Sequence, residues 1–487
     1  MRALCLALAC LIPTAAWAER PMTYREVLEG ALSNNPTVGR AELGRDQATA
    51  ALMGANGVFD PTFQLSGNYR RAQQRGFFQG FPFTSNSTSW DMGTSLSQTA
   101  PTGTTVAADV GINRDLTRFT TQFGSTTETE TEQNFFTTNM NISITQQLLR
   151  GLTTRFNMQT VTRARGTLDV AELSLEQSRQ QILATAAQAY WTWVYQDRVA
   201  ELAQDSVEVA VEAARVGGLR VDSGDLAPVE RTRLDAAVIQ ARTNLVDAEI
   251  AAQQAADAVL LLMGEVPGQD ILPATNVDDV LALDLDPQAA VEVALAQNLE
   301  IAIAKAQLEQ ARNDRAIAKQ GMLPSLSATA AAGVGSQEET ASEAVSGLFG
   351  DNNFPFVSVG GVFSVPLGNR AARAESQRAG ADVMLRELEL EEVLRRVHSE
   401  TLLQVTRLAS AQRKVDLADV QARLAAETLA AQEALNDAGR GIQRELLEDR
   451  AELDRLEAEA AKARTDWRIA QVELLRLQGQ LEGTEGL

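Results

Sequence analysis

Polar and apolar residues alternate in two separate windows of the chain, and this alternation predicts β-strands. The runs TFQLSGNYR (62–70) and NMNISITQQL (139–148) alternate in the first window, and VSVGGVFSVP (357–366) alternates in the second. Successive side chains of a strand point to opposite faces of a sheet, so each run predicts a strand with one polar and one modestly apolar face. This pattern is more typical of membrane-embedded strands than of a soluble core.

The phenylalanines follow the same two windows. All 15 lie between Phe59 and Phe156 or between Phe349 and Phe363. A helical protein does not require this segregation, whereas a membrane-embedded sheet turns aromatic side chains toward lipid and toward the membrane interface. The alternative is a small soluble β-core in which the same side chains are buried.

The rest of the chain has the pattern of unusually long helices. No proline occurs between Pro101 and Pro228, and none follows Pro366. Residues from about 155 to 222 and from about 369 to 437 are rich in Ala, Leu, Glu, Gln and Arg, which are good helix formers. At ~1.5 Å per residue, such a helix approaches roughly 100 Å.

Each long helix is followed by a turn, VDSGDLAP (221–228) or NDAGRGIQ (436–443), and then by a returning helix. The returning helices carry apolar residues at every seventh position, which predicts coiled-coil packing. The same register occurs in both halves, and its many alanines predict close helix approach. The first seam comprises Val238, Leu245, Ala252 and Val259 with Ala241, Ala248, Ala255 and Leu262, and the second Leu453, Ala460, Trp467 and Leu474 with Leu456, Ala463, Ala470 and Leu477.

The beginning of each half is repeated as well. Ala31, Leu32, Asn35 and Pro61 have counterparts 263 residues later in Ala294, Leu295, Asn298 and Pro324. The chain is therefore predicted to be an internal repeat of short helix, strands, long helix, turn and returning helix. The expected division is 19–264 (β-segment about 61–149, helical hairpin about 155–263) and 265–487 (β-segment about 324–367, helical hairpin about 369–480).

The first 18 residues, MRALCLALACLIPTAAWA, predict a secretory signal peptide. They combine an early Arg2, an apolar stretch and small residues at Ala16 and Ala18. Two alternatives are a buried N-terminal helix and a lipoprotein signal with Cys10 as the lipidated residue.

Composition narrows the functional classes. Both cysteines lie in the predicted signal peptide and the single histidine is His398, so neither a thiolate site nor a histidine cluster for metal is expected. A catalytic triad would have to use His398, which lies in a helical run and is better interpreted as an ordinary surface histidine. We find no nucleotide-binding loop and no nucleophile–base pair, so neither an enzyme nor a cofactor is expected. The net charge of −21 argues against nucleic acid as a partner.

With these features assembled, the chain resembles the TolC-like outer membrane factor (outer membrane efflux protein) family over nearly its whole mature length. The resemblance rests on the order and duplication of several short motifs. They are ALSNNP (31–36) and ALAQNL (294–299), TQQLLRG (145–151) and SVPLGN (364–369), AQAYWTWV (187–194), and the turns RVDSGDLAPVE (220–230) and NDAGRGIQRELLE (436–448).

The resemblance implies a mixed α/β membrane protein that forms a homotrimer. Three chains share one transmembrane β-barrel, which a long α-helical coiled-coil barrel continues across the periplasm. One chain has too few strands to close a barrel, and open sheet edges in lipid leave backbone groups unpaired. Three copies of about four strands close a barrel of about 12 strands. Pro61, Pro324 and Pro366 mark the junctions between helix and barrel.

The first half contains more strand-like runs than the two strands per half that the family pattern requires. SWDMGTSLSQ (89–98) and TTVAADVGIN (104–113) alternate around the turn signal APTG (100–103). Residues 88–116 therefore either form an extracellular hairpin or add strands to the barrel.

The expected function is a passive exit duct in the outer membrane of a Gram-negative bacterium. In a tripartite efflux or type I secretion system, an inner-membrane transporter and a periplasmic adaptor would pass substrate into it. The alternative is a periplasmic coiled-coil adaptor or scaffold, although adaptors usually carry one helical hairpin and this chain has two.

The resemblance also implies where the partner and the gate lie. The adaptor would contact the two hairpin tips, and carboxylates just past the tips would form the narrowest point of the duct. The family's basic gate position falls on Gly441 and its aromatic position on Asn436, so this chain departs from the pattern there. The tip residues are Ser223, Gly224, Asp225, Leu226, Gly439, Arg440, Gly441 and Ile442, and the gate residues are Glu230, Arg440, Arg444, Glu445 and Glu448.

Overall fold

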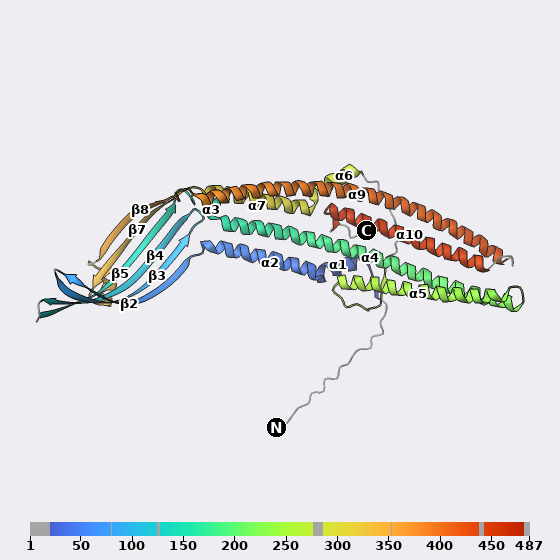
Figure 1. Ribbon diagram of the computed structural model, residues 1–487, viewed down its shortest axis with the longest axis horizontal. Helices are drawn as coiled ribbons and strands as arrows, with labels where there is room; N and C mark the ends of the chain where they lie inside the picture. Colours follow the sequence, from blue (N-terminus) through green and yellow to red (C-terminus); the bar gives the residue numbers. More distant parts are fainter. Residues whose placement is uncertain are drawn as a thin grey trace, which may run out of the picture. The chain divides into compact units, whose positions relative to one another are not determined.

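The computed structural model describes residues 20–78, 80–123, 127–275, 286–351, 353–437 and 443–481, so the predicted signal peptide lies outside the described residues. The elements follow one order twice (Figure 1). The first half contains β1 (Arg20–Met22), α1 (Tyr24–Asn34), α2 (Pro36–Asn56), a 3₁₀ turn (Gly57–Phe59), β2 (Thr62–Phe78), β3 (Phe81–Thr99), β4 (Thr104–Phe123), β5 (Thr127–Gln147), α3 (Thr154–Asn157), α4 (Gln159–Asp222) and α5 (Pro228–Leu262). The second half contains β6 (Ile271–Pro273), α6 (Pro287–Gln297), α7 (Leu299–Gly321), β7 (Ser325–Glu338), α8 (Ala341–Gly347), β8 (Phe354–Ser364), α9 (Arg370–Asp437) and α10 (Gln443–Leu477).

The chain divides into two compact units. The first unit consists of residues 1–45, 171–305 and 389–487, and it holds α1, α5, α6 and α10 together with the larger parts of α4 and α9. Strands β1 and β6 form a small parallel sheet in this unit. Within the described part of the chain, no helix is both long enough and apolar enough to cross a lipid bilayer.

The AQAYWTWV run forms the centre of this unit's core. Tyr190, Trp191 and Trp193 are almost completely buried on α4. Tyr24 of α1 packs against them, with ring centroids 5.4 Å from Tyr190 and 5.5 Å from Trp191. Burial raises the pKa of Tyr24 to about 12, so its hydroxyl stays neutral at physiological pH.

A buried asparagine joins the two ends of each repeat. Asn35 donates through Nδ2 to the carbonyl oxygen of Leu262 at the end of α5, and Asn298 donates in the same way to Leu477 at the end of α10, both at 3.0 Å. In each case the side-chain oxygen accepts the backbone N–H two residues further along, at 2.8 Å and 3.0 Å. The repeat is therefore present in the hydrogen bonds as well as in the sequence.

A glycine ends each returning helix. Gly264 follows α5 with φ 73°, and Gly479 follows α10 with φ 67°. This left-handed conformation favours glycine. A Cβ at either position would also crowd a backbone oxygen, that of Asn34 at 3.0 Å or that of Gln297 at 2.7 Å. The backbone conformation and the lack of space for a Cβ therefore both favour glycine at this position of each repeat.

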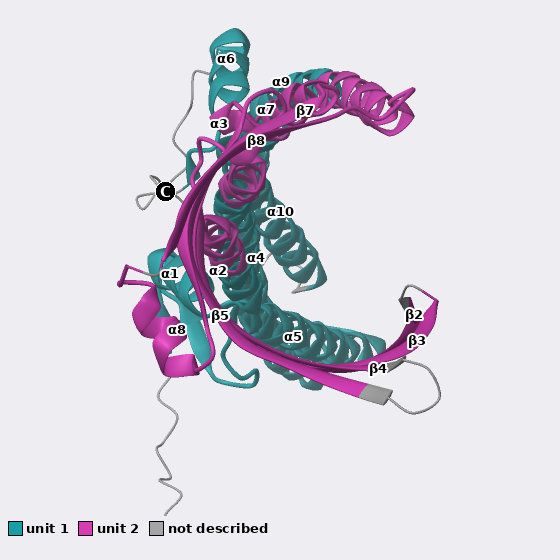
Figure 2. Ribbon diagram, turned by 90° about the vertical axis from the view of Figure 1, so that its left-hand side faces the viewer, with its two compact units in different colours: residues 1–45, 171–305, 389–487 teal, residues 46–170, 306–388 magenta. Residues whose placement is uncertain are grey.

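The second unit consists of residues 46–170 and 306–388 and contains one six-stranded antiparallel sheet. Its strand order is β2-β3-β4-β5-β7-β8, and the sheet curves strongly from one edge strand to the other (Figure 2). The prediction of about four strands per chain is wrong, because residues 88–116 add β3 and β4 to the sheet. The mixed α/β fold with two tandem repeats is confirmed.

The two faces of the sheet differ in polarity, as the alternation predicts. Cross-strand partners share a face, so the register assigns each side chain to one of the two. One face carries exposed apolar side chains and the other carries polar or small ones. The apolar face includes Leu65, Met92, Val110, Ile142 and Val359, and the polar face includes Ser66, Asp91, Asp109, Asn141 and Ser143.

Helix α8 covers part of the apolar face. The Thr138 hydroxyl donates to the carbonyl oxygen of Ala344 at 2.5 Å. A cavity of about 230 Å³ between α8 and the sheet is lined mainly by apolar side chains, among them Leu65, Val345 and Leu348. Because α8 lies outside the curve of the sheet, the apolar face is the convex one (Figure 2).

Candidate functional site

The tip of the first helical hairpin is a tight turn built on Arg220. The backbone N–H groups of Asp225 and Leu226 donate to the carbonyl oxygen of Arg220 at 2.8 and 3.1 Å, and the Ser223 hydroxyl donates to it at 3.0 Å. Gly224 has φ 83°, in the region that favours glycine, and a Cβ there would meet no atom of the described part of the chain within 4 Å. Three hydrogen bonds to one carbonyl oxygen therefore hold the turn, and the Cα of Gly224 has space around it for a partner.

The first turns of α5 pack closely on the end of α4. A Cβ at Gly217 would overlap Leu234 Cδ1, and Leu234 is buried. Arg231 adds a polar connection by donating to the carbonyl oxygen of Gly218 at 3.1 Å and pairing with Asp222 at 2.7 Å. The glycine pair therefore permits the close approach that brings the hairpin to a narrow tip.

Glu230, the predicted gate residue on α5, is half-buried. It pairs with Arg233 at 2.8 Å, one turn further along the same helix. The sequence prediction named Arg440 and Arg444 among the gate residues and overlooked Arg233. The three-residue spacing between Glu230 and Arg233 on a helix is the signal that could have found it.

The second tip is described only from its helical side. Gly439, Arg440, Gly441 and Ile442 lie outside the described residues, so the structure does not place them. On α10, Arg444 pairs with Glu448 at 3.5 Å, four residues along the helix. Glu445 is half-buried and accepts a hydrogen bond from Gln432 Nε2 of α9 at 2.9 Å. In the first turns of α10, Glu445 therefore contacts the neighbouring helix α9, whereas Glu448 pairs within its own helix.

The three predicted junction prolines lie at changes of secondary structure. Pro61 stands between the 3₁₀ turn and β2, and Pro324 directly precedes β7. Pro366 follows β8 by two residues, before α9 begins. Pro61 and Pro324 are tolerated because a missing N–H just before a strand removes no internal ladder bond, and Pro366 lies outside the ladder altogether.

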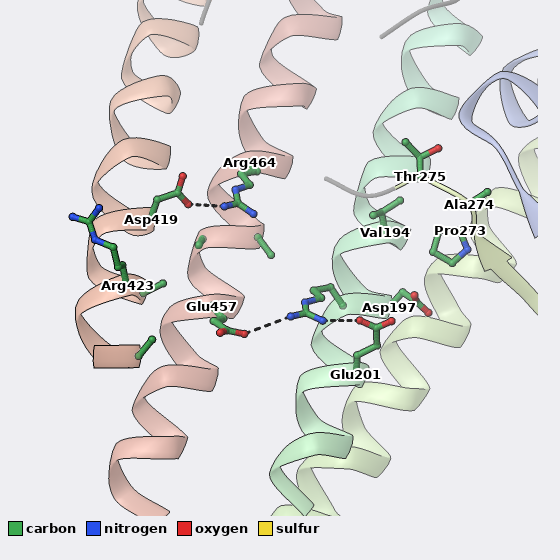
Figure 3. A pocket seen from close by; sticks show the side chains of 15 residues that line it. Val194, Asp197, Glu201, Pro273, Ala274, Thr275, Asp419, Arg423, Glu457 and Arg464 are labelled. Atoms are coloured by element: carbon green, nitrogen blue, oxygen red, sulfur yellow. Dashed lines mark hydrogen bonds and ion pairs between the residues drawn. The ribbon is translucent and has the colours of Figure 1, made fainter. Parts of the chain in front are cut away.

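The sequence prediction overlooked a charged pocket of about 580 Å³ in the first unit (Figure 3). It lies between α4, α9, α10 and the segment that follows β6. Arg464 pairs with Asp419 at 2.9 Å, and Arg198 pairs with Glu457 at 3.5 Å. Burial and the nearby Glu201 raise the pKa of a further lining residue, Asp197.

The chemistry of this pocket is that of paired charges. The Arg198–Glu457 pair connects α4 to α10 and so joins the two helical hairpins, whereas the Arg464–Asp419 pair connects α10 to α9 within one hairpin. The lining of the pocket contains carboxylates and guanidinium groups but no histidine, cysteine or serine. Within the described ranges, no group of three or more His, Cys, Asp or Glu side chains could hold a metal ion.

The sequence matches one family model. Residues 290–480, which span most of the second repeat, match the family described as outer membrane efflux protein. No curated protein sequence matches the chain.

Several solved outer membrane channels share the fold. The CmeC outer membrane channel of Campylobacter jejuni aligns with a TM-score of 0.67 and 15% identity, covering 94% of this chain and 85% of that one. The outer membrane protein VceC of Vibrio cholerae gives 0.64 and 14%, covering 94% and 96%. The open MtrE outer membrane channel of Neisseria gonorrhoeae gives 0.64 and 17%, covering 94% and 89%.

These findings confirm the resemblance that the sequence predicts. The chain has the fold of outer membrane channels, and its second repeat carries the pattern of the outer membrane efflux protein family.

Proposed function

We propose that this chain is the outer membrane exit duct of a tripartite efflux or type I secretion system. The observation that carries the proposal is the curved sheet, whose convex face is apolar and whose concave face is polar. A wall between lipid and a water-filled lumen requires that division of faces. The similarity to outer membrane channels also supports an exit duct in the outer membrane.

Three copies close the duct in this proposal. Each edge strand of the described sheet, β2 and β8, has a partner on one side only. In lipid the free edge would leave unpaired backbone N–H and C=O groups, each of which costs several kcal/mol. Pairing β8 of one copy with β2 of the next removes both edges, and the helical hairpins extend into the periplasm.

Substrate enters such a duct from partners, because the chain supplies no energy source. An inner-membrane transporter drives the transport, and a periplasmic adaptor connects the transporter to the hairpin tips. The turn at Gly224 supports this role for the first tip, because hydrogen bonds to Arg220 hold the turn and a Cβ at Gly224 would meet no atom of the described residues within 4 Å.

Purified protein reconstituted in planar bilayers tests the function. We expect stepwise ion conductance from an oligomer whose mass in mild detergent corresponds to three chains. A protein that leaves the membrane fraction without detergent and produces no conductance would instead support the periplasmic adaptor or scaffold.

Bulk at the tips is expected to block export without preventing assembly. Gly224→Trp combines a large side chain with a left-handed backbone, whereas Gly224→Asn tolerates that backbone and stays small. We expect export to fall about tenfold for Gly224→Trp, which corresponds to about 1.4 kcal/mol of lost contact, and to change little for Gly224→Asn. Gly439→Trp tests the other tip. Normal export by both Trp variants, with the oligomer intact, would rule out contact at the tips.

The carboxylates early in α10 are expected to make the duct cation-selective. Changing Glu445 and Glu448 to Gln removes two charges per copy near the predicted constriction, and we expect the cation-to-anion permeability ratio to fall roughly twofold. Block by multivalent cations should weaken as well.

The matched control changes Glu452 and Glu459 to Gln. These exposed residues lie further along α10 and pair with Arg455 at 2.6 and 2.5 Å. Selectivity measured as reversal potential in a salt gradient should be unchanged by this control. An equal effect of both double variants, or none of either, would mean that Glu445 and Glu448 only stabilise the start of the helix.

A further inference from the structure

The hairpin of β3 and β4 lies in the middle of the sheet. Gly93 of β3 is opposite Ser66 of β2 on one side and opposite Gly111 of β4 on the other. Gly111 is in turn opposite Asn139 of β5. The hairpin therefore separates β2 from β5, which would be neighbours in a sheet of four strands.

The hairpin also spans the full height of the sheet. Its turn at residues 100–103 returns to the end where β2 begins and β5 ends. There Asn157 Nδ2 donates to the carbonyl oxygen of Pro101 at 3.1 Å, and Gln146 Nε2 donates to that of Thr102 at 3.1 Å. Gly103 has φ 78°, and its carbonyl oxygen accepts the backbone N–H of Gln147 at 3.2 Å. These bonds fix the turn at the end of the sheet nearest the helices.

Both faces of the sheet continue without interruption through the hairpin. An extracellular hairpin would need no apolar face, whereas β3 and β4 have one that continues the apolar faces of β2 and β5. Its apolar side chains are Met92, Leu96, Val106 and Val110, and its polar ones on the opposite face are Asp91, Ser95, Asp109 and Asn113.

We propose that this hairpin is part of the membrane wall and widens the pore for bulky solutes. Three copies of the six-stranded sheet, joined between β8 and β2, close a barrel of about 18 strands instead of about 12. Neighbouring strands lie ~4.8 Å apart, so the circumference increases by about half. The inference rests on the proposed function, because the pore forms only when the copies close it.

The lining of the concave face keeps this additional width open. Ser66, Gly93, Gly111 and Asn139 form one row across four strands, and Gly335 of β7 continues it. All five residues are small and uncharged. Side chains of this size fill little of the lumen that the added strands enclose.

Cysteine pairs test the position of the hairpin in the full-length chain. Both native cysteines lie in the predicted signal peptide, so in the mature chain only the introduced cysteines can form a disulfide. Ser66→Cys with Gly93→Cys should form a disulfide, because the residues are cross-strand partners. Ser66→Cys with Asn139→Cys should not, because three strand spacings amount to ~14 Å and a disulfide needs Cα atoms within about 7 Å. Cross-linking of the second pair in membranes would overturn the proposal.

Deletion of residues 80–123 tests the width of the pore. It removes both strands of the hairpin and leaves β2 and β5 antiparallel and joined by a short loop. Polyethylene glycols of increasing size, added at the extracellular side of planar bilayers, measure the exclusion limit. We expect the limiting polymer radius to fall to about two-thirds of that of the full-length protein.

The outcomes separate this inference from the proposed function. Absence of conductance from the full-length protein would reject the duct itself. Conductance from both proteins with equal exclusion limits would reject only the wider pore. If the deletion variant fails to assemble, the two cysteine pairs still decide the position of the hairpin.

Discussion

Replacing Trp191 with alanine is expected to lower the free energy of unfolding by about 3–5 kcal/mol, the usual cost of truncating a buried Trp or Phe. Trp191 is only 1% exposed. Its ring lies 5.5 Å from that of Tyr190, and the guanidinium carbon of Arg468 lies 5.2 Å from its centroid. Truncation would leave a cavity among these side chains and remove the cation–π contact.

Thr192→Ala is the matched control, because Thr192 is the next residue on α4 and is exposed. We expect it to change stability by no more than about 0.5 kcal/mol. Thermal unfolding of the detergent-solubilised protein, followed by circular dichroism, measures both variants. Equal midpoints for Trp191→Ala and Thr192→Ala would show that this core does not stabilise the assembly.

Asn298→Ala is expected to destabilise the protein by about 2–4 kcal/mol. The variant loses the acceptor for the N–H groups of Glu300 and Ile301, a capping interaction of about 1 kcal/mol. It also leaves the carbonyl oxygen of Leu477 without the bond from Asn298 Nδ2, and a buried unsatisfied group costs about 1–3 kcal/mol. Asn35→Ala should behave similarly, because Asn35 makes the corresponding bonds in the first repeat.

Two further variants separate the contributions of the asparagine. Asn298→Asp keeps the acceptor oxygen but loses the donor, so it should retain the cap and still lose the contact between the helix ends. Asn56→Ala is the control, because Asn56 is exposed and its side chain donates to the carbonyl oxygen of Leu52 within its own helix. Denaturant unfolding gives the free energies. If Asn298→Ala and Asn56→Ala lower the free energy of unfolding equally, Asn298 does not stabilise the contact between the two ends of the repeat.

The sequence by itself determined the features that depend on local periodicity. The seven-residue spacing of Ala241, Ala248 and Ala255 indicates the packed face of α5, and the alternation around Ile142 indicates the two faces of β5. Runs of good helix formers without proline predict the extents of α4 and α9 within a few residues. The internal repeat was visible because its two copies keep the same spacing along the chain.

The partners of Asn35 and Asn298 could not be predicted in this way. Each asparagine bonds to a carbonyl oxygen 227 or 179 residues away in the sequence, and periodicity says nothing about such distant pairs. The ion pairs of the charged pocket, such as Arg198 with Glu457, could not be predicted from the sequence for the same reason. Only the folded chain brings these groups within hydrogen-bonding distance.

The number of strands was likewise decided by tertiary structure. Residues 89–98 and 104–113 alternate in the same way whether they stand above a sheet or inside it, so the sequence left both arrangements open. The choice depends on pairing between strands, which places Gly93 opposite Ser66 and Gly111 opposite Asn139. Backbone hydrogen bonds form that register, and because every residue offers nearly the same backbone groups, the side-chain pattern alone does not specify which strands meet.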